Sequence, residues 1–165
     1  MALTVTSGIP TQAIECIVHM AELFKGKVLL KKDGTTIPAD LALKGKKIIC
    51  IYFAAAWCPP CRMFTPVLAD AYTEAREGNQ PIEVVFVSSD RSSTDMMNYM
   101  KSHHGEWLCL PYGDSLQVLL KDRFKVAGIP SLVVCKADAT VISANGRPDI
   151  QSKGPQAFRD WLSAL

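Results

Sequence analysis

Hydrophobic and polar positions along this chain follow two spacings, one typical of helices and one of buried strands. Between residues 11 and 24 the apolar side chains recur three or four positions apart, which predicts an N-terminal helix. Residues 46–55 (KKIICIYFAA) and 82–89 (IEVVFVSS) instead contain continuous apolar runs, the pattern of strands buried on both faces. From Pro59 the helical spacing returns and continues to Gly78, where a helix end is expected.

The rest of the chain predicts shorter elements of both kinds. The expected strands and helices are a strand at 27–30 (KVLL), helices at 94–103 and about 115–124, strands at 131–135 (SLVVC) and 140–144 (TVISA) joined as a hairpin, and a closing helix at 155–164. A strand, helix and strand followed by a hairpin and a helix predict a three-layer α/β domain with a mixed sheet. A chain of 165 residues is enough for one such domain with a real core.

Charge and composition exclude several classes of protein. The formal net charge is +2, which is too small to indicate a nucleic-acid or membrane-surface partner. No stretch approaches the roughly 18 apolar residues that a membrane span needs. The first ten residues, MALTVTSGIP, lack the basic and apolar regions of a signal peptide. We therefore expect a protein of the cytoplasm, with the nucleus as a second location, both of them reducing compartments.

Two of the six cysteines lie close together in the sequence, and they are Cys58 and Cys61. Structural disulfides are rare in reducing compartments, so such a pair is either catalytic or metal-binding. A structural zinc site usually needs four ligands, and the chain has no second Cys-X-X-Cys motif. His103, His104 and Cys109 do not have the usual finger spacing. A redox dithiol without metal or tightly bound cofactor is therefore the expected use of this pair.

The position of the pair favours thiol chemistry. A predicted buried strand ends just before Cys58, and a predicted helix begins at the prolines that follow it. Proline is tolerated in the first helical turn, whose N–H groups have no partner within the helix. Those N–H groups and the positive end of the helix dipole stabilise an anion. Thiols of Cys-X-X-Cys motifs at such positions commonly have lowered pKa values, and the thiolate is the species that attacks disulfides.

Several separated motifs together resemble one known family. Residues 52–66 read YFAAAWCPPCRMFTP and are similar to the thioredoxin superfamily, and within it to the tryparedoxin and nucleoredoxin branch. Further matches follow in the same order: VVFVSSDR at 84–91, EWLCLPYGD at 106–114, RFKVAGIPSLVV at 123–134 and VISANGR at 141–147. The resemblance covers residues 27–165. Residues 1–26 lie outside it and are expected to form a helical extension packed on the domain.

The resemblance implies a thioredoxin-like fold, with a central mixed β-sheet flanked by helices, and it assigns roles to further residues. It implies a cis peptide bond between Ile129 and Pro130 that faces the cysteines, where the backbone pairs with a bound substrate segment. It also implies an exposed Trp57 that contacts partners. Without the resemblance, Pro130 would be interpreted as an ordinary strand-initiating proline, and Trp57 equally well as a core residue.

The function that the resemblance implies is reduction of protein disulfides by dithiol exchange. Cys58 is the expected nucleophile and Cys61 the resolving cysteine. Partners would be disulfide-containing proteins and an electron donor, either a thioredoxin reductase or a low-molecular-weight thiol. A redox-regulated binding module of the nucleoredoxin type, with turnover secondary, is the alternative. A disulfide isomerase or oxidase stays open as a third possibility, because it depends on the reduction potential.

One position departs from ordinary thioredoxins. Six residues before the first cysteine they carry a buried aspartate that assists proton transfer at the second cysteine, whereas this chain has Tyr52. A tyrosine is a poor base at neutral pH. The proton of Cys61 could pass to water, to the substrate or to another carboxylate such as Asp90. Asp90 could equally begin the helix that follows it.

The remaining candidate residues receive structural interpretations. Cys50 and Cys135 fall in apolar strands and are expected to be inert core residues, while Cys16 and Cys109, the latter in a predicted loop, receive no role. The His103–His104 pair is expected at a solvated helix end. Arg147 matches an arginine near the substrate groove of the family, but an ordinary surface arginine fits equally well.

Overall fold

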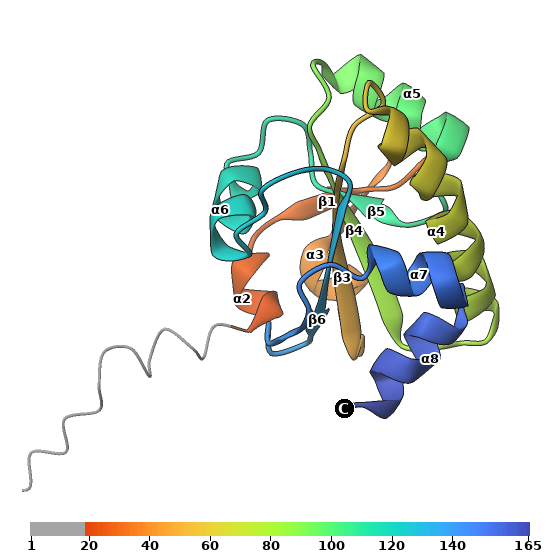
Figure 1. Cartoon of the computed structure of the whole chain (residues 1–165). Coiled ribbons are helices and arrows are strands. Elements are labelled where there is room, and N and C mark those ends of the chain that lie inside the picture. Colours follow the sequence, from red (N-terminus) through yellow and green to blue (C-terminus); the bar gives the residue numbers. More distant parts are fainter. Residues whose placement is uncertain (1–18) are drawn as a thin grey trace, which may run out of the picture.

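The fold is a mixed β-sheet between two layers of helices, and a computed structural model describes it for residues 19–165 (Figure 1). Within these residues the sheet has seven strands in the order β2-β1-β5-β4-β3-β6-β7. The strands are β1 (Val28–Leu30), β2 (Thr36–Pro38), β3 (Ile48–Ala54), β4 (Ile82–Ser88), β5 (Leu108–Cys109), β6 (Ser131–Lys136) and β7 (Val141–Ser143).

The two central strands bring their carboxyl ends to the same edge of the sheet. β3 pairs with β4 in parallel, and the register joins Ala54 to Ser88 at the end of both strands. β6 pairs with the other side of β3 in antiparallel orientation, so that its first residue, Ser131, lies opposite Phe53. The loops after β3 and β4 and the loop before β6 therefore meet at this edge of the sheet.

Helices cover both faces of the sheet. They are α2 (Met20–Leu23), α3 (Ala39–Ala42), α4 (Pro59–Glu77), α5 (Ser93–His103), α6 (Leu116–Arg123), α7 (Arg147–Lys153) and α8 (Gln156–Ser163). Buried residues of α4, α5, α7 and α8 share one core cluster with alternate positions of β3 and β4. Buried residues of α2, α3 and α6 share a second cluster on the opposite face. Figure 1 shows the same division, with α4, α7 and α8 on one side of the strands and α2 and α6 on the other.

The alternation of β3 explains this arrangement. Cys50, Tyr52 and Ala54 point to the α4 side, whereas Ile51 and Phe53 point to the α2 side. All seven residues of β3 are buried, because helices cover both faces. A strand that is buried on both sides needs a continuous apolar run, which is what the sequence shows.

The predicted α/β architecture is confirmed, with differences in its short elements. The hydrophobic pattern did not predict α3, α7, β2 or β5. Of the helix expected over residues 11–24, only Met20–Leu23 is helical among the described residues, as α2. Residues 11–18 lie outside the described residues. α4 continues through Pro66 to Glu77 as expected from its apolar spacing.

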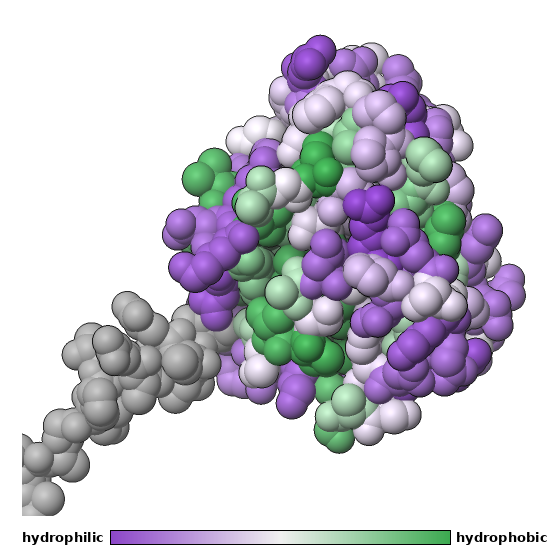
Figure 2. Space-filling view, viewed as in Figure 1, coloured by the Kyte–Doolittle hydropathy of each residue, from purple (hydrophilic) through white to green (hydrophobic). Residues whose placement is uncertain are grey.

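The surface carries both polar and apolar areas. On the face shown in Figure 2, polar side chains cover α7 and α8, while apolar side chains gather near the β6–β7 end of the sheet beside α2. Val141 on the edge strand β7 is 44 % exposed. None of the helices formed by residues 19–165 is long and apolar enough to cross a membrane.

Glu83 is a carboxylate buried at the start of β4, far from the cysteine pair. Its Oε1 accepts hydrogen bonds from the Tyr72 hydroxyl at 2.8 Å and from the Val84 N–H at 3.0 Å. A guanidinium nitrogen of Arg76 lies 3.9 Å from the other oxygen. Burial nevertheless raises the pKa of Glu83 above its ordinary value, because desolvation outweighs these hydrogen bonds and the nearby cations.

The difference in the free energy of unfolding between Glu83→Gln and wild type should therefore depend on pH. A folded-state pKa above the unfolded value stabilises the protein fully below the unfolded pKa, and this contribution is lost as the pH rises through the folded pKa. The variant should thus gain stability relative to wild type between pH 4 and pH 7, as measured by urea unfolding at several pH values. Glu106→Gln, at an exposed side chain, serves as the matched control. A Glu83→Gln advantage that shrinks towards pH 7 would contradict the prediction.

Candidate active site

Cys58 occupies the N-cap of α4, and its sulfur points at the start of that helix. Its backbone is extended, with φ −92° and ψ 111°, and Pro59 and Pro60 form the first turn. The Cys61 N–H donates to Cys58 Sγ at 3.3 Å. A helix of 19 residues directs its positive end at this sulfur. The geometry therefore stabilises negative charge on Cys58 Sγ, as expected from the sequence.

Cys61 lies one turn further along and is fully buried. Burial, followed by a hydrogen bond with Cys58, raises the pKa of the Cys61 thiol to about 12, while the cationic Arg147 partly opposes this. The two sulfurs thus differ in environment. The Cys58 sulfur lies at the start of the helix in a residue that is 5 % exposed, whereas Cys61 is fully buried and its raised pKa keeps it a protonated thiol.

The loop before β6 completes the surroundings of the pair. The Ile129–Pro130 peptide bond is cis, as the resemblance implied. The carbonyl oxygen of Ile129 lies 4.0 Å from Cys58 Sγ. Ile129 is half-buried and Pro130 is buried, so the carbonyl of Ile129 is held next to Cys58 Sγ.

Trp57 lies beside the pair and is 48 % exposed, as expected for a partner contact rather than a core residue. Its indole N–H donates to the Ser89 carbonyl at 2.9 Å, which fixes the ring in place. The guanidinium of Arg91 lies 5.6 Å from the centre of the ring. A cleft of about 360 Å³ opens next to Trp57, between its loop and α5, and Asp90, Asp95 and other residues line it.

A buried polar cluster takes the place of the usual aspartate. The Thr65 hydroxyl donates to the Cys61 carbonyl at 2.8 Å. It lies 2.6 Å from the Tyr52 hydroxyl and 2.5 Å from the Tyr99 hydroxyl, so both phenols donate to it. Burial raises the pKa of Tyr52 far above its ordinary value. Tyr52 therefore supports the first turn of α4 and is no proton acceptor at neutral pH.

Asp90 does not begin the helix that follows it. The N-cap of α5 is Ser92, whose hydroxyl accepts from the Asp95 N–H at 3.0 Å, so Asp90 does not begin the helix. Its carboxylate instead accepts from the Ala56 N–H at 2.8 Å and from the Ser88 hydroxyl at 2.6 Å. One oxygen of Asp90 thus holds the loop that precedes Cys58, and the other is held by Ser88 at the end of β4.

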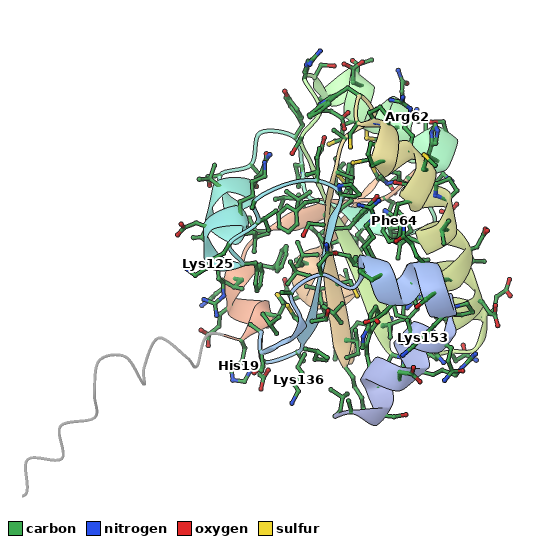
Figure 3. All side chains as sticks on the ribbon, in the orientation of Figure 1. His19, Arg62, Phe64, Lys125, Lys136 and Lys153 are labelled. Carbon is green, nitrogen blue, oxygen red and sulfur yellow. The ribbon has the colours of Figure 1, made fainter. Side chains whose placement is uncertain are left out.

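Arg147 lies at the start of α7 and packs against the helix that carries the cysteines. It is half-buried, with its guanidinium 5.9 Å from the centre of the Phe64 ring. Its Nε is buried and has no hydrogen-bond partner within residues 19–165. Figure 3 shows Phe64 on the inner side of α4, whereas Arg62 lies near the end where this helix begins. The positive charge of Arg147 partly opposes the rise in the pKa of Cys61.

Two expectations for other residues are wrong. His104, expected at a solvated helix end, is 4 % exposed and packs between the rings of Phe86 and Tyr99 at 4.4 Å. Its Nδ1 accepts from the Trp107 indole N–H at 3.0 Å. Cys109, expected in a loop, belongs to β5 and is fully buried. Contacts with distant parts of the chain, rather than the local sequence pattern, determine the burial of both residues.

The cysteines outside the pair have no access to partners where they are described. Cys50, Cys109 and Cys135 are buried free thiols. Burial raises the pKa of Cys135 to about 12, and it raises those of Cys50 and Cys109 as well. Cys16 lies outside the described residues. No cluster of three or more potential metal ligands occurs among residues 19–165.

Thr65, Ser88 and Tyr99 also belong to the site, although the sequence did not point to them. A threonine four residues after Cys61 is the only local signal for the polar cluster, because a hydroxyl at that spacing can reach the carbonyl one turn back. Ser88 and Tyr99 reach the site through contacts that no spacing along the chain reveals.

The mixed sheet, the dithiol at the start of the helix after β3 and the facing cis-proline together define the class of thioredoxin-fold proteins. A family model described as thioredoxin-like matches residues 45–141. The chain belongs to this thioredoxin-like family of thiol–disulfide oxidoreductases, in its nucleoredoxin and tryparedoxin branch.

Individual relatives support this placement. The chain is 34 % identical to probable nucleoredoxin 1 of Arabidopsis thaliana over 150 residues, which is 91 % of this chain and 25 % of that protein. Among solved structures it is similar to thioredoxin related protein 16 of Carcinoscorpius rotundicauda, with 48 % identity, a TM-score of 0.74, and coverage of 84 % of this chain and 96 % of that one. Tryparedoxin II of C. fasciculata gives 34 % identity, a TM-score of 0.71, and coverage of 81 % and 91 %. The chain spans 25 % to 33 % of the first nucleoredoxins it matches.

Proposed function

We propose that this chain reduces protein disulfides by dithiol exchange through Cys58 and Cys61. The observation that carries the proposal is the position of Cys58 Sγ, which accepts the Cys61 N–H at 3.3 Å at the start of α4 and lies 4.0 Å from the Ile129 carbonyl. Negative charge is stabilised on this sulfur, and a second sulfur lies one turn away. These are the requirements of a nucleophile and a resolving thiol.

The reaction proceeds in two exchanges. The Cys58 thiolate attacks one sulfur of the substrate disulfide, forms a mixed disulfide, and releases the other sulfur as a thiolate that takes a proton from water. Cys61 then attacks Cys58 Sγ, and its proton passes to the second substrate sulfur as that sulfur leaves. The substrate gains two electrons and two protons, and the protein is left with a Cys58–Cys61 disulfide. No metal or bound cofactor takes part.

Proton transfer from Cys61 directly to the leaving sulfur fits the surroundings of this thiol. Burial keeps Cys61 protonated, and Tyr52 offers no basic group. The leaving substrate sulfur is itself a base when the disulfide breaks. The substrate therefore supplies the proton acceptor that a buried aspartate would otherwise provide.

Substrate binding is assigned to the exposed face around Cys58. Trp57 offers a ring held by the Ser89 carbonyl, and Ile129 and Pro130 offer an ordered backbone beside the sulfur. An extended segment of the substrate would lie between them, pairing with the backbone before the cis bond. A thioredoxin reductase or a low-molecular-weight thiol would return the dithiol to its reduced form.

The test is insulin reduction by dithiothreitol, followed by turbidity. Wild-type protein should accelerate precipitation of the reduced insulin chains well beyond dithiothreitol alone. Acceleration that grows in proportion to protein concentration supports a dithiol reductase. A rate equal to that of dithiothreitol alone at all protein concentrations would overturn the proposal for insulin-like substrates.

The alternative is a redox-regulated binding module of the nucleoredoxin type. Its support is the exposed Trp57 beside a cleft of about 360 Å³. The similar protein from Carcinoscorpius rotundicauda has a role in regulating the activity of the transcription factor NF-kB. Partner binding that survives Cys58→Ser in a pull-down would favour the module, whereas binding that depends on Cys58 favours the reductase.

Two further expectations remain proposals. We place the protein in the cytoplasm, with the nucleus as a second location, because a dithiol that acts as a reductant needs a reducing compartment. We also keep residues 1–26 as an extension packed on the domain of residues 27–165. In its described part, Met20 and Phe24 are buried, and the Met20 N–H donates to the Ala137 carbonyl at 3.0 Å.

A further inference from the structure

Asp90 lies at the end of β4 in a set of hydrogen bonds that the dithiol reaction itself does not use. The side chain is buried, at 7 % exposure. One carboxylate oxygen accepts from the Ala56 N–H at 2.8 Å, and the other accepts from the Ser88 hydroxyl at 2.6 Å. The Asp90 N–H donates back to the Ser88 oxygen at 2.9 Å. The carboxylate is therefore held rigidly against Ala56, two residues before Cys58.

The same segment holds the loop before Cys58 at two more points. The Ser89 N–H donates to the Ala54 carbonyl at 2.9 Å, and the Trp57 indole N–H donates to the Ser89 carbonyl at 2.9 Å. Three hydrogen bonds thus join residues 88–90 to residues 54–57. Figure 1 shows the loops after β3 and β4 at the same end of the sheet, where this contact forms.

A helix on the other side of the sheet holds the segment in turn. Gln117 of α6 donates to the Ser88 carbonyl at 2.8 Å, and Lys121 donates to the Ser89 hydroxyl oxygen at 3.2 Å. From the end of α6 the chain leads directly to the cis bond before Pro130. Residues 88–90 are therefore fixed from two sides. On one side lies the loop that precedes Cys58, and on the other lies α6, which leads to the loop before Pro130.

Cys58 needs this placement because its chemistry depends on short distances. Its sulfur must stay 3.3 Å from the Cys61 N–H to receive the stabilisation of the helix start. Among the hydrogen bonds to the preceding loop, the one that the Ala56 N–H donates to the Asp90 carboxylate is charge-assisted. Charge-assisted hydrogen bonds are shorter and stronger than neutral ones. Loss of the carboxylate would leave the Ala56 N–H without this partner and free the peptide that leads into Trp57 and Cys58.

We propose that Asp90 is a positioning residue that holds the Ala56 peptide and thereby keeps Cys58 Sγ at the start of α4. The inference rests on the proposed function only in taking Cys58 as the reactive thiol. Asp90 acts through a hydrogen bond to the backbone, and the oxygen that accepts the Ala56 N–H is the group that matters.

The test compares Asp90→Ala with Asp90→Asn by the alkylation of Cys58 with iodoacetamide, quantified on the Cys58 peptide by mass spectrometry from pH 5 to 9. In Asp90→Ala, we expect the alkylation rate of Cys58 to fall about tenfold at each pH, because the sulfur moves off the helix start. In Asp90→Asn, the amide oxygen can still accept the Ala56 N–H, so the rate should stay within about threefold of wild type.

Two further variants separate positioning from charge and from misfolding. Asp95→Ala removes an exposed carboxylate that lines the same cleft, and it should leave the alkylation profile unchanged. Ser88→Ala removes the hydroxyl that fixes the Asp90 carboxylate, and it should lower the alkylation rate of Cys58 as Asp90→Ala does, by less. It tests the inference if Asp90→Ala fails to fold by circular dichroism.

Each outcome counts for or against the positioning role. A folded Asp90→Ala with the wild-type profile, or an Asp90→Asn that loses as much as Asp90→Ala, would overturn that role. If Asp90→Ala is unfolded, a Ser88→Ala variant with the wild-type alkylation profile would overturn the positioning role. Alkylation needs no disulfide substrate, so absence of insulin reduction by wild type would count against the proposed function and leave this test intact.

Discussion

Cys58→Ser should lose catalysed insulin reduction: once the rate of dithiothreitol alone is subtracted, its rate should be at least about 100-fold below that of wild type. A serine hydroxyl at the start of α4 still accepts the Cys61 N–H, so the helix cap and the fold are kept. The hydroxyl stays protonated at neutral pH and does not attack a disulfide. The measurement is the turbidity assay at fixed dithiothreitol, with equal concentrations of wild type and variant.

The matched control replaces a cysteine that takes no part. Cys109 is fully buried, and its thiol donates to the Leu110 carbonyl at 3.1 Å, a bond that a serine hydroxyl can also make. Cys109→Ser should keep the insulin reduction rate within about twofold of wild type. Residual Cys58→Ser activity close to wild type would mean that another thiol attacks the substrate, and the assignment of Cys58 would be wrong.

Cys61→Ser completes the assignment. The first exchange needs only Cys58, so this variant, mixed with insulin in the absence of dithiothreitol, should form a mixed disulfide and then stop. Non-reducing electrophoresis should show a covalent adduct that disappears on adding dithiothreitol. An absence of adduct alongside full wild-type activity in the turbidity assay would contradict the division of roles between Cys58 and Cys61.

Local signals in the sequence were sufficient for the central part of the site. A strand buried on both faces has to be continuously apolar, so β3 was visible from residues 46–55. Prolines directly after Cys58 mark a first helical turn, so the N-cap position followed from spacing alone. The cis bond before Pro130 came from the resemblance, because cis is the minority state even before proline.

Contacts between distant segments account for most of what the sequence did not reveal. β5 has two residues and exists only through its pairing with β1 and β4. The hydrogen bond from the Ala56 N–H to the Asp90 carboxylate joins residues 34 positions apart, and neither residue type predicts it. His104 is buried because aromatic side chains from several elements converge on it. By contrast, α7 had a local signal in Pro148, a proline in the first turn of a helix, and could have been predicted.

Gly146→Ala should destabilise the fold by about 2 kcal/mol, the middle of the range for an overpacked core. Gly146 is the N-cap of α7 and has an ordinary φ of −81°, so space rather than backbone freedom requires glycine here. A Cβ at this position would lie 2.7 Å from a methyl carbon of Val134 and 2.9 Å from the Trp161 ring. Urea unfolding followed by tryptophan fluorescence measures the change.

Two comparisons decide whether the cause is steric. At Gly128 an added Cβ meets nothing within 4 Å, so Gly128→Ala should change the free energy of unfolding by less than about 1 kcal/mol. Val134→Ala removes the nearest methyl carbon, so the double variant with Gly146→Ala should be more stable than the sum of the two single losses, by about 1 kcal/mol. Simple additivity would show that Val134 is not the clashing group, and a Gly146→Ala variant as stable as wild type would show that α7 moves aside at no cost. In that case the start of α7, with Arg147 near Cys61, would not be fixed by close packing at Gly146.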